Sequence, residues 1–339
     1  MAEPDAKVHI TRLLVAIVAY KAAPLTIDCL ASIEPERAAV PGLRVIVVDN
    51  ASPDGAADAV ADAIDRRGWS SWATLVRAPS NRGFAAGNNV AIREMLAELP
   101  RRDFVLLLNP DTVVRPGALG RLLDFMLTHP RAGIAGGRSE DLDGTPQVCC
   151  FRFPNAINDL LGHLGVGLLD RLFEHHLTRL GIPQQSLKVD WVSGAYMLVR
   201  REVVEQIGLM DEAYFLYFEE TDYALRAQQA GWECWHVPDS RVVHLVGQSS
   251  GVTVRDRAPR RLPAYWYESR RRYFVRHHGR VYAVLTDLAL AVACPIGRLR
   301  HRLAGKSQRT PPNFVGDLLR HSALWSAEPP PVIALQAEP

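Results

Sequence analysis

The chain has 339 residues, enough for a large buried core in one long α/β domain or in about two smaller domains. Its 39 basic and 37 acidic residues leave a formal net charge of +2, which argues against a general nucleic-acid-binding protein. The five cysteines form no CxxC pair, so we expect no zinc site. The apolar run Leu13–Tyr20 ends at Lys21 without a small-residue cleavage site, which favours a buried strand over a signal peptide and suits a reducing cytosol.

Strands and helices alternate in the first half of the sequence. Short apolar runs predict strands at Leu13–Ala19, Val45–Val48, Thr74–Arg77 and Phe104–Leu108. Helices are expected between them, one beginning near Pro24 and another extending from Ala56 to Arg66. A glycine-bearing loop at Asn81–Asn88 leads into a helix that ends near Pro100. This alternation predicts βαβ units and a mostly parallel, Rossmann-like sheet.

The second half has a weaker pattern. Residues 144–185 are irregular and receive no assignment. Regular structure is then predicted at Val189–Val199. It is followed by a helix from Arg201, a helix from near Glu219 to Gly231, and strands around Glu233–Val237 and Arg241–Val246. From Arg257 onward the composition becomes basic, aromatic and helical, and the proline-rich tail after Pro329 is expected to be disordered.

The basic C-terminal part is suited to contact with a membrane surface. The segment Tyr265–Tyr273 mixes aromatic residues with arginines, which fits a membrane interface or a lipid pyrophosphate. An amphipathic helix packed on the core would have the same composition, so both interpretations stay open. The apolar stretch Val281–Gly297 is interrupted by Asp287 and Pro295, and we expect it not to span a bilayer.

Acidic residues follow two of the predicted strands. Asp49 comes directly after Val45–Val48, and Asp111 follows shortly after Phe104–Leu108. Ligands of open α/β sheets bind at the carboxyl ends of parallel strands, and a helix N-terminus after the Asn81–Asn88 loop would suit a diphosphate. Each aspartate alone can be explained as a turn residue, but their joint placement indicates a ligand site.

A series of motifs follows in a fixed order: VAIVAY at 15–20, VIVVDNAS at 45–52, NRGFAAGN at 81–88, LLNPD at 107–111, WVSGA at 191–195, FLYFEETDY at 215–223, and His244 followed by Gly247 and Ser249. The first four motifs resemble family 2 glycosyltransferases of the GT-A fold. The later motifs resemble the rhamnosyltransferase-like branch of that family. Because the matches extend in order from residue 12 to residue 250, they are more specific than any single motif.

This resemblance implies how a nucleotide-sugar donor is held. Ala19 and Asp49 would lie at the nucleotide, where Asp49 would accept a hydrogen bond from the base or ribose. The 81–88 loop would approach the donor closely, because its glycines remove side-chain bulk. The residues expected to contact the donor there are Asn81, Gly83, Gly87 and Asn88. Without the family pattern, the same segment is simply a loop and helix cap.

The resemblance also implies a divalent metal, Mg²⁺ or Mn²⁺, bound by Asp111. The family pattern is an acidic-x-acidic triplet, but its first position is Asn109 in this chain, and an amide is a poorer ligand than a carboxylate. Asn109 would therefore touch the donor sugar or a metal-bound water. His244 would supply a further ligand, and an imidazole favours Mn²⁺. A lone histidine at a strand end is otherwise an ordinary polar residue.

Inverting transfer, which the family implies, needs a carboxylate that takes the proton of the acceptor hydroxyl. The family's base maps onto Glu220, a glutamate where aspartate is commoner, and Glu219 is the fallback. Helical spacing places Glu219, Asp222 and Arg226 on one face, so that the last two can pair. Glu220 points about 100° away from Glu219, toward a cleft. The alternative is that these acids only favour the positive end of a helix.

The acceptor or sugar pocket is expected to be lined by Trp191, Ser193 and Gly194, because aromatic faces suit pyranose rings. A buried core tryptophan is the alternative for Trp191. Glu219 and Asp222 are expected on the acceptor side of the site.

These expectations divide the chain into a GT-A glycosyltransferase domain at 1–255, a helical, basic and aromatic extension at 256–328 and a tail at 329–339. The expected reaction transfers L-rhamnose from dTDP-L-rhamnose, with inversion, to a hydroxyl of a glycan or lipid-linked acceptor. The protein would be cytoplasmic and peripheral on the inner face of the cell membrane. Alternatives are another donor, such as a UDP-sugar, and a non-catalytic sugar-binding module, which the presence of Asp111 and Glu220 disfavours. A Rossmann dehydrogenase is disfavoured because no GxGxxG follows the first strand.

Overall fold

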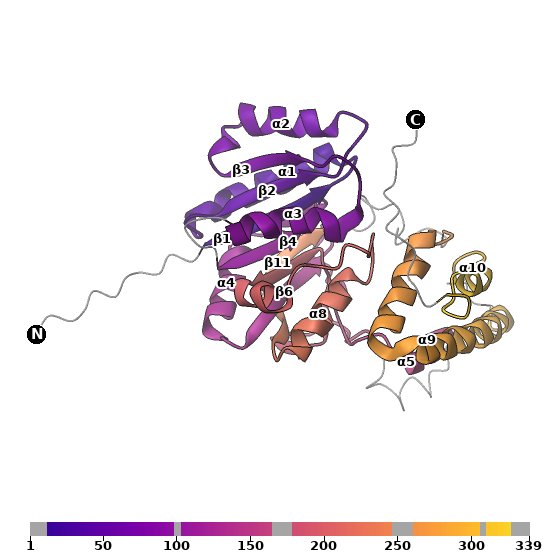
Figure 1. Cartoon of the computed structure of the whole chain (residues 1–339). Helices are drawn as coiled ribbons and strands as arrows, with labels where there is room; N and C mark the ends of the chain where they lie inside the picture. The colour runs from indigo at the N-terminus through magenta and orange to yellow at the C-terminus, as the bar shows by residue number, and fades with distance from the viewer. Residues whose placement is uncertain (1–11, 98–102, 165–177, 246–259, 306–309, 327–339) are drawn as a thin grey trace, which may run out of the picture.

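The computed structural model describes residues 12–97, 103–164, 178–245, 260–305 and 310–326. Within these ranges a nine-stranded sheet forms the centre, and a group of helices lies to one side of it (Figure 1). The strands of this sheet are β1 (Leu13–Ala19), β2 (Arg44–Asp49), β3 (Ala73–Arg77), β4 (Phe104–Leu108), β5 (Thr112–Val114), β6 (Ala132–Glu140), β8 (Leu187–Val189), β10 (Tyr196–Arg200) and β11 (Glu233–His244). A separate pair is formed by β7 (Cys150–Phe151) and β9 (Trp191–Val192).

The helices fall into two groups. Those around the sheet are α1 (Ala23–Ile33), α2 (Ala56–Arg66), α3 (Gly83–Ala97), α4 (Ala118–Thr128), α7 (Arg201–Ile207) and α8 (Glu219–Gln229). Those to one side are α5 (Ala156–Leu164), α9 (Ala264–Leu303) and α10 (Phe314–Arg320). Short 3₁₀ turns occur at Glu34–Ala38 and Trp69–Ser71.

Most strands of the described sheet share one direction. β1 pairs in parallel with β2 and β4, and β2 with β3. β10 is antiparallel to both β4 and β6, so β4 and β6 have the same direction. β11 is parallel to β6. The carboxyl ends of β1, β2, β3, β4, β6 and β11 consequently lie along one edge. The predicted mostly parallel α/β sheet is confirmed, with β5, β8 and β10 running the other way.

Alternate residues of β1 contribute to two cores. Leu13, Val15 and Ile17 pack in a cluster with residues of α1, α2 and α4. Leu14 and Ala16 pack in a second cluster with residues of α3, α7 and α8. All five side chains are buried, as expected for a central strand covered on both faces.

Two predicted strand regions are arranged differently. The regular structure predicted at Val189–Val199 consists of three strands, β8, β9 and β10, which pair with different neighbours. β8 pairs with β11, β9 pairs with β7, and β10 pairs with β4 and β6. The strands predicted at Glu233–Val237 and Arg241–Val246 are one strand, β11, whose register against β6 shifts between Val237 and Arg241. A bulge of this kind re-aims side chains without ending the strand.

β6 was not indicated by the sequence, because glycines weaken the strand pattern of its AGIAGGRSE segment. The structure shows why glycine is needed there. A Cβ at Gly133 would lie 2.7 Å from the side chain of Trp232, and one at Gly137 would lie 2.3 Å from the carbonyl oxygen of Ser240. Neighbouring segments therefore fill the space that side chains of β6 would take.

The glycine loop predicted at Asn81–Asn88 is shorter, because α3 already begins at Gly83. Gly83 has a φ of +87°, and a Cβ there would lie 2.0 Å from the carbonyl oxygen of Phe215. Gly87 lies inside α3, where a Cβ would lie 2.6 Å from Cγ1 of Val18. Close approach of other protein segments thus accounts for both glycines.

The C-terminal part is helical, as predicted. α9 bends at Gly279, whose φ of 82° and ψ of 162° are not helical, and it packs on α5 and α10 (Figure 1). The predicted features near Pro100, at Val246–Ser249, at the 255 domain limit and at 329–339 lie outside the described residues.

We predict that Gly83→Ala destabilises the fold more than Gly55→Ala. Both positions have a left-handed backbone, but the space around Gly55 is open. Strain alone should cost about 1–2 kcal/mol at either site, and the clash with Phe215 should cost Gly83→Ala a further ~1–3 kcal/mol. Urea denaturation of both variants measures the difference. Equal midpoints would show that the Phe215 backbone moves aside freely.

Candidate active site

A cavity of about 710 Å³ lies at the carboxyl edge of the sheet. Residues that end or follow parallel strands line it: Tyr20 after β1, Asn50 after β2, Asn109 after β4, Ser139 on β6 and His244 on β11. The polar residues of the cavity therefore lie at the carboxyl ends of the parallel strands, where open α/β sheets bind their ligands.

A hydrogen-bonded group of Asn50, Asn81 and Gly83 forms one wall of the cavity. The Asn50 side-chain amide donates to Oδ1 of Asn81 at 2.9 Å and to the carbonyl oxygen of Gly83 at 3.0 Å. The Gly83 N–H donates to the same Asn81 oxygen at 3.0 Å. These bonds fix the start of α3 beside the cavity.

Asp111 and His244 come together across the β5–β11 pair. Thr112 of β5 is opposite His244 in the register, so Asp111 is placed beside the imidazole. His244 Nε2 lies 3.5 Å from Asp111 Oδ1 and 3.4 Å from Nδ2 of Asn109. The Asp111 side chain is 1% exposed and that of His244 is 14% exposed, and both line the cavity.

This pair fits one side of a Mg²⁺ or Mn²⁺ site. A carboxylate oxygen and an imidazole nitrogen are suitable ligands for such ions, and they already lie near each other. Within the described ranges no group of three or more histidine, cysteine, aspartate or glutamate side chains could hold a metal ion. The remaining ligands would therefore have to come from water and from a substrate diphosphate.

Two carboxyl groups face the cavity from the beginning of α8. Glu219 and Glu220 both line it, and each has one buried carboxyl oxygen that accepts no hydrogen bond from the described part of the chain. Just before them, Tyr217 and Phe218 have positive φ angles of 72° and 67°. A strained backbone persists only where surrounding contacts stabilise it. Here the Phe218 ring packs against the rings of Trp266 and Tyr273 of α9.

The two glutamates have different electrostatic surroundings. Burial raises the pKa of both carboxyl groups. The adjacent Glu220 charge raises the pKa of Glu219 further, whereas backbone hydrogen bonds, including one from Gly194, oppose the rise in the pKa of Glu220. Burial therefore favours the protonated form of both carboxyl groups.

Several residues expected at the donor lie outside the cavity lining. Ala19 ends β1, and its carbonyl oxygen accepts the N–H of Asn50. Asp49 is buried, and its Oδ2 accepts the N–H of Ser52 at 2.9 Å. Gly87 packs on β1 as described above, and the buried Asn88 donates to the carbonyl oxygen of Phe84 within α3.

The residues expected at the acceptor are divided. Ser193 and Gly194 line the cavity with Glu219. Trp191 does not line it: its ring stacks on Phe151 with centroids 4.3 Å apart, and its Nε1 donates to a backbone carbonyl.

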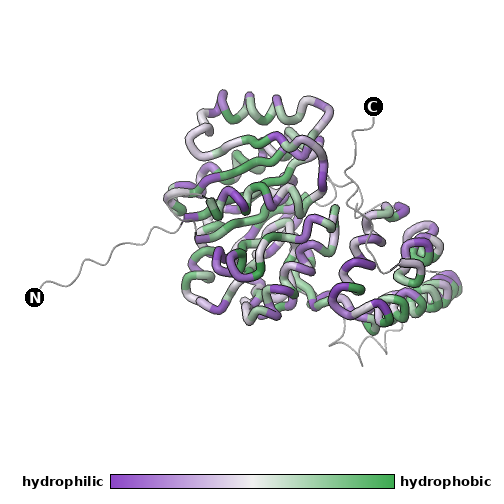
Figure 2. Tube along the Cα trace, viewed as in Figure 1, coloured by the Kyte–Doolittle hydropathy of each residue, from purple (hydrophilic) through white to green (hydrophobic). Residues whose placement is uncertain are grey.

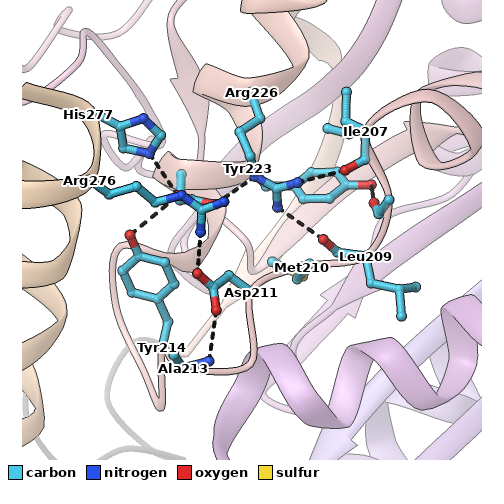
Figure 3. Close-up of polar contacts among 12 residues, drawn as sticks. Ile207, Leu209, Met210, Asp211, Ala213, Tyr214, Tyr223, Arg226, Arg276 and His277 are labelled. Carbon is cyan, nitrogen blue, oxygen red and sulfur yellow. Dashed lines mark hydrogen bonds and ion pairs between the residues drawn. The ribbon is translucent and has the colours of Figure 1, made fainter. Parts of the chain in front are cut away.

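Asp222 is fully buried and is absent from the lining. The predicted pairing of Asp222 with Arg226 is confirmed at 2.8 Å, and His277 of α9 lies 2.7 Å from the other carboxylate oxygen. Figure 3 shows Arg226 and His277 approaching this point from α8 and α9. Although burial raises the pKa of Asp222, the hydrogen bond from His277 and the charge of Arg226 lower it overall. Asp222 thus joins α8 to α9.

Some lining residues were not singled out from the sequence. They are Tyr20, Asn50, Phe84, Gln147, Arg179, Phe215 and Tyr265. All of these except Gln147 and Arg179 belong to the quoted motifs or to the aromatic segment that begins at Tyr265, so their positions were signalled although no role in the cavity was given to them. Arg179 and Gln147 lie in the irregular 144–185 segment, where no periodic pattern indicates which side chains turn inward.

The sequence matches the family described as "Glycosyltransferase like family 2" over residues 11–262. The chain belongs to this glycosyltransferase family. It is similar to an N-acetylglucosaminyl-diphospho-decaprenol L-rhamnosyltransferase of Mycobacterium tuberculosis, 28% identical over 256 residues that cover 72% of this chain and 75% of the relative. It is also similar to the dTDP-rhamnosyl transferase RfbF of Shigella flexneri, 27% identical over 208 residues that cover 61% of each protein.

A solved structure shows the same fold. The mannosyltransferase PcManGT from Pyrobaculum calidifontis, in complex with GDP-Man and Mn²⁺, matches this glycosyltransferase with a TM-score of 0.52 and 19% identity. The match covers 95% of this chain and 82% of that one. The expected GT-A fold is therefore confirmed, and the chain is a family 2 glycosyltransferase with a long C-terminal helix.

We predict that Glu220→Gln lowers turnover by ~10²–10⁴-fold, the usual contribution of a general base. Donor affinity should change little, because the partner of the base is the acceptor hydroxyl. In the unmodified enzyme the acidic limb of kcat/KM should lie above the ordinary glutamate range, because burial raises the pKa of Glu220.

Glu219→Gln is the matched control for this prediction. It should keep turnover and leave the acidic limb near its original pH, because burial raises the pKa of Glu220. The assignment is wrong if Glu219→Gln loses turnover while Glu220→Gln keeps it. Full pH profiles of both variants decide the matter.

Proposed function

We propose that the protein transfers L-rhamnose from dTDP-L-rhamnose, with inversion, to a hydroxyl of a lipid-linked glycan at the cytoplasmic face of the membrane. The observation that carries this proposal is that Asp111 with His244 and Glu219 with Glu220 line one cavity. The donor and acceptor classes are supported by the names of the similar proteins, one acting on a diphospho-decaprenol acceptor and one named for dTDP-rhamnose.

The carboxylate of Glu220 performs the acid–base step in this proposal. It accepts the proton of the acceptor hydroxyl while that oxygen bonds to the anomeric carbon and the bond to the nucleotide diphosphate breaks. Attack from the side opposite the leaving group inverts the anomeric configuration.

Asp111 and His244 would hold Mn²⁺ or Mg²⁺ beside the donor diphosphate. When bound, the ion supplies positive charge that stabilises the departing diphosphate. An imidazole ligand favours Mn²⁺ over Mg²⁺. Asn109, whose amide lies 3.4 Å from His244, is placed to contact the donor or a water molecule of the site.

A donor screen tests this function directly. Release of nucleotide diphosphate would be measured with dTDP-L-rhamnose, UDP-galactose, UDP-N-acetylglucosamine and GDP-mannose, using a short-chain N-acetylglucosaminyl-diphospho-polyprenol as acceptor. We expect dTDP-L-rhamnose to be the best donor, activity to require Mn²⁺ or Mg²⁺, and the product to have the opposite anomeric configuration to the donor. The proposed donor is wrong if a UDP-sugar is turned over and dTDP-L-rhamnose is not.

A further inference from the structure

The part of α9 that follows Gly279 has a continuous apolar face that the described chain leaves uncovered. The exposed side chains are spaced three or four residues apart, so they form one stripe along the helix. The stripe consists of Val281, Leu285, Leu288, Val292, Ile296, Leu299 and Leu303. It is about 33 Å long at 1.5 Å per residue. Figure 2 shows hydrophobic colour recurring along this helix.

The opposite face of the same helix is packed against protein. Buried residues of this face include Leu290, Cys294 and Gly297. A Cβ at Gly297 would lie 1.8 Å from the carbonyl oxygen of His163, so α5 lies directly against the helix. Leu290 and Cys294 pack in a cluster with Phe314 of α10. The stripe is therefore the outer side of a helix whose orientation is already fixed.

The aromatic segment Tyr265–Tyr273 does not form this surface. Tyr267 and Tyr273 are buried, and Arg270 is buried in ion pairs with Asp159 and Asp287. The sequence left two interpretations open for this segment, contact with a membrane interface and packing on the core. These side chains pack on the core. The surface available to a partner thus lies later in α9 than the sequence indicated.

Spanning a bilayer is inconsistent with these contacts, although α9 is long and apolar enough to cross one. A spanning helix would have to leave α5 and α10. It would also expose Asp287, which is held by Arg270 and by Ser322, to hydrocarbon. A helix lying in the plane of the interface keeps all of these contacts.

Charge and aromatic residues beside the stripe favour a lipid surface as its partner. Exposed Arg280 and Arg302 lie near its two ends and would attract anionic headgroups. Arg280 also donates to the carbonyl oxygens of Ala323 and Leu324, which brings the 70% exposed Trp325 to the same end. Tryptophan is favoured at the membrane–water interface.

We propose that the α9 stripe docks on an anionic lipid bilayer, parallel to its plane, so that the cavity can reach an acceptor anchored in that bilayer. The need for an anchored acceptor rests on the proposed function, whereas the docking surface itself does not. Tyr265, at the beginning of α9, lines the cavity, so one helix joins the catalytic site to the docking surface.

Vesicle co-sedimentation tests this proposal with the full-length protein. The vesicles would contain equal parts of phosphatidylglycerol and phosphatidylcholine. Leu285→Glu combined with Val292→Glu should reduce the partition coefficient at least about tenfold, since burial of each apolar side chain is worth about that factor. Leu127→Glu, at an exposed leucine of α4, is the matched control and should bind like the unmodified protein. Circular dichroism verifies the fold of each variant.

Two further measurements separate the possible failures. Transfer to a water-soluble short-chain acceptor should be equal in all three proteins; its absence from all of them would contradict the proposed function without affecting the docking surface. Docking is overturned if the unmodified protein stays in the supernatant or if the double variant binds vesicles equally well. It is also overturned if sedimentation velocity shows a lipid-independent dimer that only the double variant loses, because a second copy would then cover the stripe.

Discussion

The ion pairs of Glu140 hold together the strands that place Asp111 and His244 in the cavity. Glu140, at the end of β6, is fully buried and accepts bonds from Arg115 at 2.8 Å and from Arg241 at 2.8 Å. Arg115 follows β5 and Arg241 belongs to β11, so one carboxylate joins three segments. A slip of one residue between β5 and β11 would turn His244 to the other face of the sheet, away from Asp111. We infer that Glu140 fixes the register that places both candidate ligands in the cavity.

A second buried carboxylate connects the beginning of α8, which carries Glu219 and Glu220, to the rest of the molecule. Asp222 is one helical turn or less from Glu219 and Glu220, and its bonds to Arg226 and His277 hold α8 against α9. Removing one partner from such a buried group typically costs ~3–5 kcal/mol. Phe218, packed on Trp266 and Tyr273, adds an apolar contact at the strained start of α8. The helix with the exposed apolar stripe therefore also supports the carboxyl groups in the cavity.

The fold was predictable where its signals are local. An apolar run that stops at a polar residue is visible in sequence, so β1, β2 and β4 and the position of Asp111 could be anticipated. The residues that contact the donor were harder to predict, because a glycine or aspartate near a predicted site can have a structural role and no contact with the ligand. Gly87 faces Val18, and Asp49 accepts a backbone N–H of its own loop, but only tertiary structure reveals either contact. The same holds for Arg179, for the glycines of β6, and for which face of α9 is left uncovered.

Asp111 and His244 are proposed to bind the donor diphosphate through a divalent ion, and calorimetric titration of dTDP measures this binding. The unmodified protein should bind dTDP more tightly with Mn²⁺ than with a chelator. Asp111→Asn keeps the size of the side chain but removes its charge, so this metal-dependent gain should disappear. Asp58→Asn, at an exposed position of α2, is the control and should retain the gain. An unchanged Mn²⁺ dependence in Asp111→Asn would contradict the account.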